Sequence, residues 1–500
     1  MILSRVNATV NIKTHPSIAF SRTNIDIQAG SKKVILIPSY VSLREWDRYK
    51  SLSVTSSAPV TIYLVNHSLI FTDMLVTFPL SAVPQEYYVV SIPQRYFGRF
   101  KSLFAIAGSA VSHSVVTIIA KVPLTIEGRK FEANSPVTLQ LQPMESIKIS
   151  SEIDDLTGTK IVSDVPVSVY SGHECISRHL CNNMMKQIPA VEYWGKEYII
   201  APMVGSVYGN LVKILAARNG TLVHANGELY ILNEGQSAEI YFYNNNYFSV
   251  GSNEPILVSY FSMGSYKESF RYDPIMLLIP AVTQFTNELS IVTPPYDFES
   301  YANIIIDSTH KDELMIDGVK LISPWTTITN TNYSSTIIHF RSQQGRHSLK
   351  PTSTDIKFGL MLYGYGRHDS YGLPVAMGST KQFANFKSYL KERCPDLSLK
   401  VFKKRIATWF QVIHDFEIIS NNLTMPIPQG DTSKMDEVLR YIFTYLDRDK
   451  FKGYLDKNEL SILFDGLHSY EPCIPRFINS CFEDSQYIMG IELNRWQNCF

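Results

Sequence analysis

A thirteen-residue stretch near the C-terminus has the residue types and spacing that bind a divalent cation. It runs from Asp447 to Glu459, with oxygen-bearing side chains at alternate positions, a turn glycine at Gly453 and a closing glutamate. Hard cations such as Ca²⁺ take several oxygen ligands, and a bidentate glutamate commonly completes such a loop. For one Ca²⁺ ion, the candidate ligands are Asp447, Asp449, Lys450, Tyr454, Asp456 and Glu459.

This loop is one residue longer than a standard EF-hand loop. Gly453 and Glu459 fit the pattern if the extra residue precedes the glycine, where a backbone carbonyl near Lys450 replaces a side-chain ligand. Lys452 opposes binding, because its ammonium group repels a cation. A second loop, Asp484 to Arg495, ends in an arginine where a carboxylate is usual, so we expect packing and a disulfide to hold it without metal.

Helical patterns surround the first loop. Apolar residues recur at three- and four-residue steps from Leu399 to Ile413, which is typical of one face of an amphipathic helix. A second helix, from about Lys434 to Leu446, has Asp431 near its start as a cap and leads directly into the loop. We therefore expect a linker at 379–393 and a small all-α domain with an EF-hand pair at 394–500.

The chain has six cysteines, an even number that favours disulfides: Cys175, Cys181, Cys394, Cys473, Cys481 and Cys499. Cys175 and Cys181 can form a bridge if the loop between them doubles back. The nearby His173 and His179 are six residues apart, so they would not share a helical face as the histidines of a zinc protease do. We favour the disulfide over a zinc site.

Residues 1 to about 378 consist of short β-branched and aromatic runs separated by Gly, Pro, Asn and Ser, which predicts strands, among them Lys33–Pro38. Similar strings around Pro59, Pro166 and Pro255 indicate a repeat of about 90 to 110 residues. The fold expected is a series of tandem β-sandwich-like units. Their expected bounds are 1–125 and 126–220, followed by a β-rich region at 221–378.

Charge and composition exclude some partners. Lys+Arg and Asp+Glu each total 46, so no net field attracts nucleic acid, and apolar runs are too short for a membrane span. The N-terminus lacks a signal-peptide pattern, so for a secreted protein we expect a segment missing ahead of Met1. Acceptor sequences for N-glycosylation occur at Asn7, Asn66, Asn219, Asn332 and Asn422.

The C-terminal part resembles the extracellular calcium-binding domain of the osteonectin/SPARC family. The motifs that carry this resemblance are Cys394-Pro-Asp-Leu, Trp409, Gly453-Tyr-Leu, Glu459-Leu, Cys473-X7-Cys481 and Trp496-X-X-Cys499-Phe500. The resemblance covers about 390–500 and implies disulfides Cys394–Cys473 and Cys481–Cys499, as well as the extra residue in the first loop. This chain departs from the family at Lys452, in a shorter segment before the first loop and in a longer second loop.

The β-rich part resembles the N-terminal region of IgGFc-binding protein and its relatives over about 1–378. The resemblance rests on the segment from Asp164 to Pro202, on Asp273-Pro-Ile-Met-Leu-Leu-Ile-Pro280, and on Tyr363-Gly-Tyr-Gly366 with Tyr371-Gly-Leu-Pro374. Known members are secreted and are adhesive or associated with mucin. The usual opening strands of that region are not recognisable here.

These observations predict a secreted, non-enzymatic adhesion or matrix-associated binding protein, whose partners are extracellular proteins or glycans such as mucin or matrix components. The alternatives are an extracellular glycan-acting hydrolase and a purely structural spacer, although no pair of acidic residues stands out as catalytic. Tyr363, Tyr365 and Tyr371 either pack in the core or form an exposed binding surface, and core packing is favoured.

Overall fold

The computed structural model divides the chain into two compact units, Met1–Ser379 and Thr380–Phe500. It describes only residues of the first unit. The described residues are 1–67, 72–80, 85–93, 101–152, 154–174, 182–206, 208–243, 246–267, 270–294, 298–340, 345–366 and 369–375. The expected linker and EF-hand domain at 379–500 therefore lie outside the described residues.

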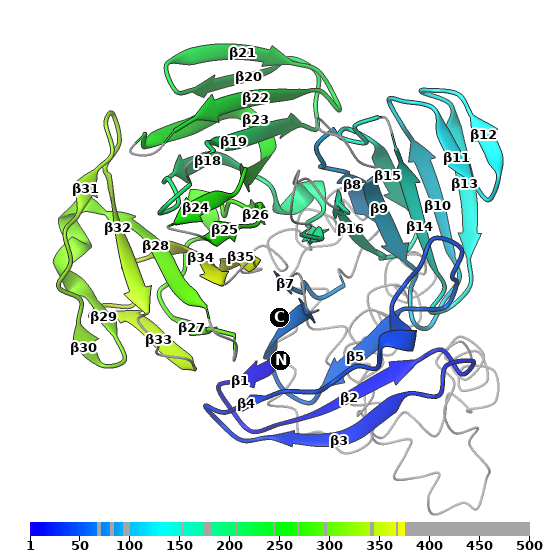
Figure 1. Cartoon of the computed structure of the whole chain (residues 1–500), viewed down its shortest axis with the longest axis horizontal. Helices are drawn as coiled ribbons and strands as arrows, with labels where there is room; N and C mark the ends of the chain where they lie inside the picture. Colours follow the sequence, from blue (N-terminus) through cyan, green and yellow to red (C-terminus); the bar gives the residue numbers. More distant parts are fainter. Residues whose placement is uncertain are drawn as a thin grey trace, which may run out of the picture. The chain divides into compact units, whose positions relative to one another are not determined.

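The strands of the first unit group into four modules that follow one another around a common centre (Figure 1). Each module ends in a strand that lies at this centre: β7 (Thr72–Val76), β17 (Met184–Ile188), β26 (Ile275–Leu278) and β35 (Asp369–Val375). β7 contacts β17 and β35, and β26 contacts the same two strands. The four central strands therefore close a ring.

The modules repeat one strand order. The inner sheet, which contains the central strand, runs β4-β1-β6-β7 in module 1, β14-β9-β16-β17 in module 2, β22-β19-β23-β26 in module 3 and β32-β28-β34-β35 in module 4. The outer sheet runs β3-β2-β5, β13-β10-β15-β8, β21-β20-β23-β18 and β30-β29-β33-β27 in the same order of modules. All these pairings are antiparallel.

In modules 1 and 2 the two sheets are separate. Module 1 contains β1 (Ile2–Ser4), β2 (Ala8–Thr14), β3 (Ser21–Ile27), β4 (Lys32–Lys33), a 3₁₀ turn (Ser39–Val41), β5 (Leu52–Ser56), β6 (Val60–His67) and β7. Module 2 contains β8 (Gln85–Tyr88), β9 (Ser102–Ala107), β10 (Ser114–Ile119), β11 (Leu124–Ile126), β12 (Arg129–Phe131), β13 (Pro136–Leu141), β14 (Ser146–Ser151), β15 (Lys160–Ser163), β16 (Ser168–His173) and β17.

In module 3 the long strand β23 belongs to both sheets, which merge into one sheet of seven strands. This module contains a 3₁₀ turn (Val191–Tyr193), β18 (Gly195–Ile200), β19 (Asn210–Ala216), β20 (Thr221–Ala225), β21 (Glu228–Leu232), β22 (Ser237–Phe242), β23 (Phe248–Ser262), β24 (Ser265–Lys267), β25 (Phe270–Tyr272) and β26.

Module 4 returns to two separate sheets. It contains a 3₁₀ turn (Val282–Gln284), β27 (Leu289–Val292), β28 (Glu299–Asp307), a 3₁₀ turn (Ser308–Glu313), β29 (Leu314–Ile316), β30 (Val319–Lys320), β31 (Thr326–Thr327), β32 (Tyr333–Phe340), β33 (Arg346–Pro351), β34 (Phe358–Gly366) and β35.

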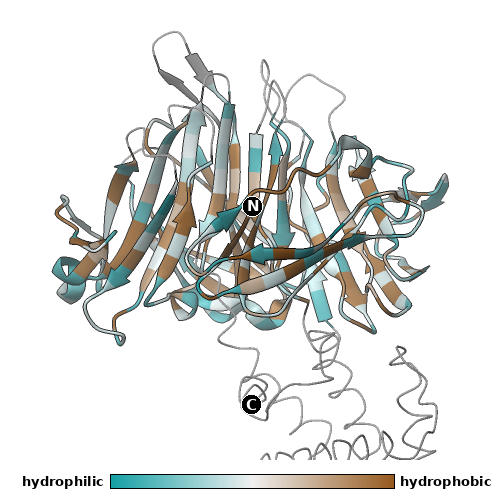
Figure 2. Ribbon diagram, turned by 90° about the horizontal axis from the view of Figure 1, so that it is seen from below, coloured by the Kyte–Doolittle hydropathy of each residue, from teal (hydrophilic) through white to brown (hydrophobic). Residues whose placement is uncertain are grey.

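Apolar side chains join the modules to one another. Apolar and polar residues intersperse along the strands (Figure 2), as expected where one face of a strand is buried. One buried cluster unites module 2 with Phe261 of module 3, another unites module 3 with Tyr363 of module 4, and a third unites module 4 with Tyr63 of module 1. The hydrophobic effect therefore acts across the module boundaries as well as within the modules.

The prediction that the N-terminal region is mainly β is confirmed. The three prolines of the predicted repeat mark equivalent strands, because Pro59 and Pro166 shortly precede β6 and β16, and Pro255 lies within β23. Strands pair across both residues that were expected as boundaries: β9–β14 and β10–β13 across residue 125, and β19–β22 across residue 220. The domain bounds at 1–125, 126–220 and 221–378 stay a prediction. The strand expected over Lys33–Pro38 pairs only through Lys33.

None of the helices in the described residues is long and apolar enough to cross a membrane.

Two glycine backbones meet where module 2 contacts module 3. Gly158 has a φ of +84°, and a Cβ added to it would lie 2.0 Å from the carbonyl oxygen of Gly235. Gly235 also has a positive φ, of +71°. Only glycine fits both the backbone conformation and the space at this contact.

We predict that Gly158→Ala lowers the free energy of unfolding by about 3 kcal/mol, because the new methyl group pushes the two modules apart as well as straining the backbone. Gly128→Ala is the matched control. Gly128 also has a positive φ, but a Cβ there meets nothing within 4 Å, so its cost is about 1 kcal/mol. Urea unfolding measures both. Equal losses in the two variants would contradict the tight contact between modules.

Candidate functional site: the polar centre of the ring

The residues predicted to bind calcium, Asp447 to Glu459, lie outside the described residues, as do all six cysteines and Asn422. In the part of the chain that the structure describes, no group of three or more His, Cys, Asp or Glu side chains is placed to hold a metal ion. His173 of the rejected zinc motif is a buried residue of β16, and His179 is not described. The sites proposed from local sequence motifs thus stay predictions.

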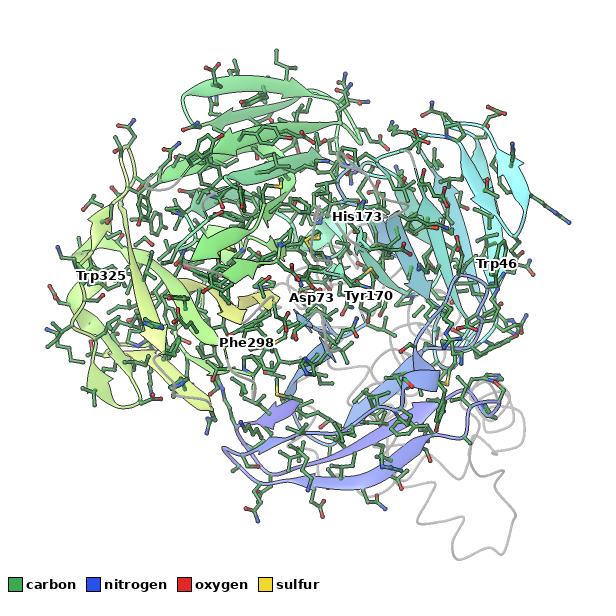
Figure 3. The ribbon with its side chains drawn as sticks, viewed as in Figure 1. Trp46, Asp73, Tyr170, His173, Phe298 and Trp325 are labelled. Carbon is green, nitrogen blue, oxygen red and sulfur yellow. The ribbon has the colours of Figure 1, made fainter. Side chains whose placement is uncertain are left out.

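The described residues instead bring charged groups together at the centre of the ring. Asp73, on the central strand β7, forms an ion pair with Lys186 on β17, and both side chains are buried. The backbone amide of Met185 donates to Asp73 Oδ2 at 2.8 Å, and Lys186 Nζ donates to the carbonyl oxygen of Met74 at 2.7 Å. Figure 3 shows Asp73 near the centre, while Trp46 and Trp325 lie at the periphery. This ion pair joins module 1 to module 2.

Burial dominates the electrostatics of this pair. It raises the pKa of Asp73 to about 6, although the Lys186 ammonium and two backbone amides act in the opposite direction. Burial also lowers the pKa of Lys186. Both directions have the same physical cause, since an environment of low polarity disfavours either charge, and each partner offsets only part of that cost for the other.

A second polar contact on β7 joins module 1 to module 4. The backbone amide and hydroxyl of Thr72 donate to the two carboxylate oxygens of Asp369 on β35, at 2.5 and 2.6 Å. The Nδ1 atom of His67 lies 2.7 Å from the Thr72 hydroxyl. Burial raises the pKa of Asp369, against the effect of these hydrogen bonds. The first and last modules are therefore joined by a partly buried carboxylate.

Further polar side chains complete the centre. Asn182, just before β17, donates through Nδ2 to the carbonyl oxygens of Pro274 and Ser370, at 2.9 and 3.2 Å. The hydroxyl of Ser370 donates to the carbonyl oxygen of Asp273 at 2.7 Å. Residues from modules 2, 3 and 4 thus share one network of hydrogen bonds.

A buried lysine also lies between modules 2 and 3. Lys213 of β19 donates to Asp155 Oδ2 at 2.6 Å and to the carbonyl oxygen of Ser91 at 2.9 Å, and it pairs with Glu239 at 3.1 Å. A buried ammonium needs such partners because it has lost its water. Like Lys186, it holds neighbouring modules in one arrangement.

Each of these charged groups forms an ion pair or hydrogen bonds with a neighbouring module. The polar groups at the centre therefore have a structural role, which is to hold the modules together. The sequence analysis missed Asp73, Lys186, Lys213 and Asp369. A usable signal exists for the lysines, because Lys186 lies in Met184-Met-Lys-Gln-Ile188 and Lys213 in Leu211-Val-Lys-Ile-Leu215. A single lysine within an apolar strand indicates a buried charge with a fixed partner.

The three tyrosines considered as a binding surface are all buried: Tyr363, Tyr365 and Tyr371. The Tyr363 hydroxyl donates to Asn303 Oδ1 at 3.0 Å, and that of Tyr371 donates to Ser300 Oγ at 2.8 Å. Core packing is therefore correct for these residues, and the interpretation as an exposed surface is wrong.

Four of the predicted glycosylation positions are described and exposed: Asn7, Asn66, Asn219 and Asn332. The Oδ1 atoms of Asn7 and Asn219 accept hydrogen bonds from backbone amides, of Ala29 and Glu234 respectively. These bonds do not use the side-chain nitrogen to which a glycan is attached. The positions are compatible with modification, which stays a prediction.

We predict that Lys186→Met lowers the free energy of unfolding by about 3 to 5 kcal/mol at neutral pH, because it leaves Asp73 buried without a counter-charge. The raised pKa of Asp73, about 6 against an ordinary 3.8, means that the folded protein binds this proton more readily than the unfolded chain. Protonation therefore favours folding, a contribution that is complete at low pH and is lost as the pH rises through about 6. The defect of Lys186→Met should shrink as the pH falls from neutral toward about 4.

Chemical unfolding at a series of pH values measures this effect. Arg5→Met is the control, because the ion pair of Arg5 with Glu288, at 2.8 Å, also joins two modules but is exposed. Exposed pairs contribute less than about 1 kcal/mol, so this variant should remain close to the wild type. A loss in Lys186→Met that does not depend on pH would contradict the burial of the Asp73 charge.

Two family models match separate parts of this chain. The model for IgGFc binding protein covers residues 73–364, more than half of the chain, and the model for the calcium-binding region of secreted protein acidic and rich in cysteine (SPARC) covers residues 391–499. These are the two families that the sequence motifs indicated.

Individual relatives agree with this division. Human IgGFc-binding protein is 23% identical over 333 residues, which is 65% of this chain and 6% of that protein. Mouse Testican-1 is 30% identical over 118 residues, which is 22% of this chain and 25% of that protein. The solved structure of chicken CNTN1 FN1–FN3 domains matches at 9% identity with a TM-score of 0.10, covering 57% of this chain and 96% of that one, and carries no argument about the fold.

The chain thus spans only a small part of either curated relative. Because the first model covers most of the ring and the second most of the remaining residues, the protein belongs to the IgGFc-binding protein family and continues into a SPARC-like calcium-binding region.

Proposed function

We propose that this protein is a secreted, extracellular binding protein with an adhesive or matrix-associated role and no enzymatic activity. The observation that carries the proposal is the tandem match of one chain to two families, one named for binding an antibody fragment and the other for secretion and calcium binding. Exposed glycosylation sequences at Asn7, Asn219 and Asn332 support an extracellular setting.

The ring of modules is suited to present a binding surface. Its modules are fixed to one another by apolar clusters and by buried ion pairs such as Asp73–Lys186. A rigid framework lowers the entropic cost of binding, since little has to be ordered when a ligand arrives. We propose that this surface binds extracellular proteins or glycans, with mucin or matrix components as the partner class.

The C-terminal region adds a calcium site in this proposal. We assign it an all-α EF-hand pair with disulfides Cys394–Cys473 and Cys481–Cys499, and we expect Cys175–Cys181 to close a loop of module 2. One Ca²⁺ ion is held by the loop from Asp447 to Glu459. The match of residues 391–499 to a calcium-binding region supports this assignment.

Calorimetric titration of the full-length protein with calcium tests the site. We predict saturable binding of one ion, which Glu459→Gln abolishes because it removes the bidentate carboxylate that closes the loop. Glu417→Gln, which lies outside both loops, should bind as the wild type does. Absence of binding at millimolar calcium would show that the repulsion from Lys452 prevails.

A screen of the full-length protein on immobilised IgG Fc, mucin and a glycan array, with and without calcium, tests the binding role. We expect specific retention of at least one protein or glycan and no change in the retained molecule. Cleavage of a glycan, lost on mutation of a single acidic residue, would contradict the non-enzymatic assignment and favour a hydrolase. Retention that survives deletion of residues 1–378 would contradict a binding role for the ring.

A further inference from the structure

One edge of the outer sheet is open in all four modules. Within the described residues the outer sheets end at β3, β13, β21 and β30, and no strand pairs with the far side of any of these four. The position is therefore an edge of the repeating unit itself, because no module supplies a strand for it. In Figure 1, β21 (Glu228–Leu232) lies at the periphery of the ring, at the top of the view.

Three of the four edge strands carry features that oppose pairing with another chain. β3 contains Arg22 and Asp26, and its register with β2 is interrupted. β13 begins with Pro136 and exposes polar side chains, and β30 consists of only two residues, one of them Lys320. Charges, prolines, bulges and short length are the devices by which proteins protect the edges of their sheets.

β21 lacks this protection along its length. Its outward side chains are Leu229 and Ile231, which are 53% and 68% exposed. Leu222 of β20 lies beside Ile231 on the same face and is 39% exposed. The one charged residue of β21, Glu228, lies next to the turn. An aliphatic edge strand of this kind is a site for pairing with another strand.

The backbone of β21 is oriented for such pairing. β20 and β21 are joined by the two-residue turn Asn226-Gly227, in which both residues have a positive φ. The residues that flank such a turn bond to each other, and bonded pairs then alternate along the hairpin. Leu229 and Ile231 therefore direct their amides and carbonyls away from β20. The amide of Leu222, opposite Ile231, agrees with this pattern, since it donates to Asn253 Oδ1 on the other side of β20, at 2.8 Å.

The sequence of β21 is self-complementary in an antiparallel pairing. With Tyr230 on a two-fold axis, Leu229 of one copy faces Ile231 of the second copy. Both of these pairs use amides and carbonyls that β20 leaves free. On the outward face, Leu222 and Ile231 of one copy form a row with Leu229 of the second copy, and the symmetry repeats this row. Such cross-strand apolar neighbours stabilise a sheet.

Charge does not oppose the association of two copies. Lys+Arg and Asp+Glu each total 46, so the copies carry no net charge that would repel. On the outward face of the β20–β21 hairpin, the ionisable side chain is that of His224, opposite Leu229. In the two-fold register, both β21 strands lie between the two copies of His224. Like charges therefore do not meet at this contact.

We propose that two copies of this protein associate through β21, which pairs with its counterpart and joins the outer sheets of both third modules into one continuous sheet. A self-complementary two-fold contact gives a closed dimer. Two strands of five residues bury less than a standard interface of about 1,600 Å², so the dimer is weak. It doubles the binding surfaces of one particle, which raises avidity on a repetitive ligand. The inference goes beyond the proposed binding role and requires neither a ligand nor calcium.

Sedimentation equilibrium of the full-length protein, at concentrations up to the millimolar range, tests the proposal. We expect a reversible equilibrium of monomer and dimer. Ile231→Lys should weaken the dimer by at least about tenfold, because it places a charge on the edge strand. Val162→Lys is the matched control. Val162 is also an exposed aliphatic residue of an outer sheet, at 39%, but its strand β15 is paired on both sides, so this variant should dimerise as the wild type does.

A second pair of variants tests the role of the backbone. Ile231→Pro removes an amide that points to the open side of β21 and leaves the hydrogen bonds to β20 in place, so dimerisation should weaken by at least about tenfold. Ile231→Val keeps the amide and a β-branched side chain, and should dimerise nearly as well as the wild type. If Ile231→Pro does not fold, Ile231→Lys still decides the question, because it changes only an exposed side chain.

Oxidative cross-linking tests the register. In the proposed pairing the two copies of Tyr230 face each other without mutual hydrogen bonds, and the Cα atoms of such a pair are about 4.5 Å apart, within the range of a disulfide. Tyr230→Cys should therefore give a covalent dimer. Leu229→Cys is the control. Leu229 lies diagonally from its own counterpart, at about 7 to 8 Å, and should not cross-link.

Four results would overturn the proposal. One is a monomer at every concentration. Another is a dimer that Ile231→Lys and Ile231→Pro leave unchanged, which would assign the association to a different surface. Slow hydrogen exchange of the Leu229 and Ile231 amides at every concentration would mean that the protein's own chain covers the edge. Slow exchange of these amides only when a ligand from the binding screen is added would assign the edge to another protein. Exchange that slows as the protein concentration rises supports the dimer.

Discussion

Two adjacent side chains of the short strand β7 join module 1 to both of its neighbours in the ring. Successive residues of a strand point to opposite faces, so Thr72 reaches Asp369 of the last module while Asp73 reaches Lys186 of the second. The central strand of module 1 therefore holds the neighbour on each side. Hydrophobic burial brings the modules together, but it has no direction. These polar contacts add specific side-chain pairings at the two boundaries of module 1.

Much of the fold could be predicted from local patterns. Short β-branched runs predicted a mainly β region, and the prolines at 59, 166 and 255 found the equivalent strand in three modules. The fourth module was missed because its equivalent strand, β34, starts after Ile356-Lys357 without a proline. Closure of the ring could not be predicted, since it depends on contacts such as Thr72–Asp369, between residues far apart in the sequence.

The sequence motifs identified the two families correctly, but they did not predict the charged residues at the centre of the ring. The motifs around Trp194 and Cys473 led to the two families that the chain matches. The buried lysines of the ring lie in strands that are otherwise mostly apolar. Lys186 therefore only interrupts the apolar pattern of its strand, and the pattern does not identify it as a site. The role of Lys186 follows from its ion pair with Asp73, which only the three-dimensional structure shows.

The contact between Gly158 and Gly235 bears on the history of the repeat. Four modules with one strand order indicate successive duplications of a single ancestral unit. Duplicated units start out interchangeable, yet here each boundary has its own contact. The boundary of modules 2 and 3 requires two glycines, that of modules 1 and 2 has a buried Asp–Lys pair, and that of modules 1 and 4 has a threonine that donates to an aspartate. Each copy has become specific for its own neighbours, so recombination that exchanged or deleted one module would leave a mismatched surface on both sides. We therefore expect such a chain to diverge by substitution more readily than by gain or loss of a module.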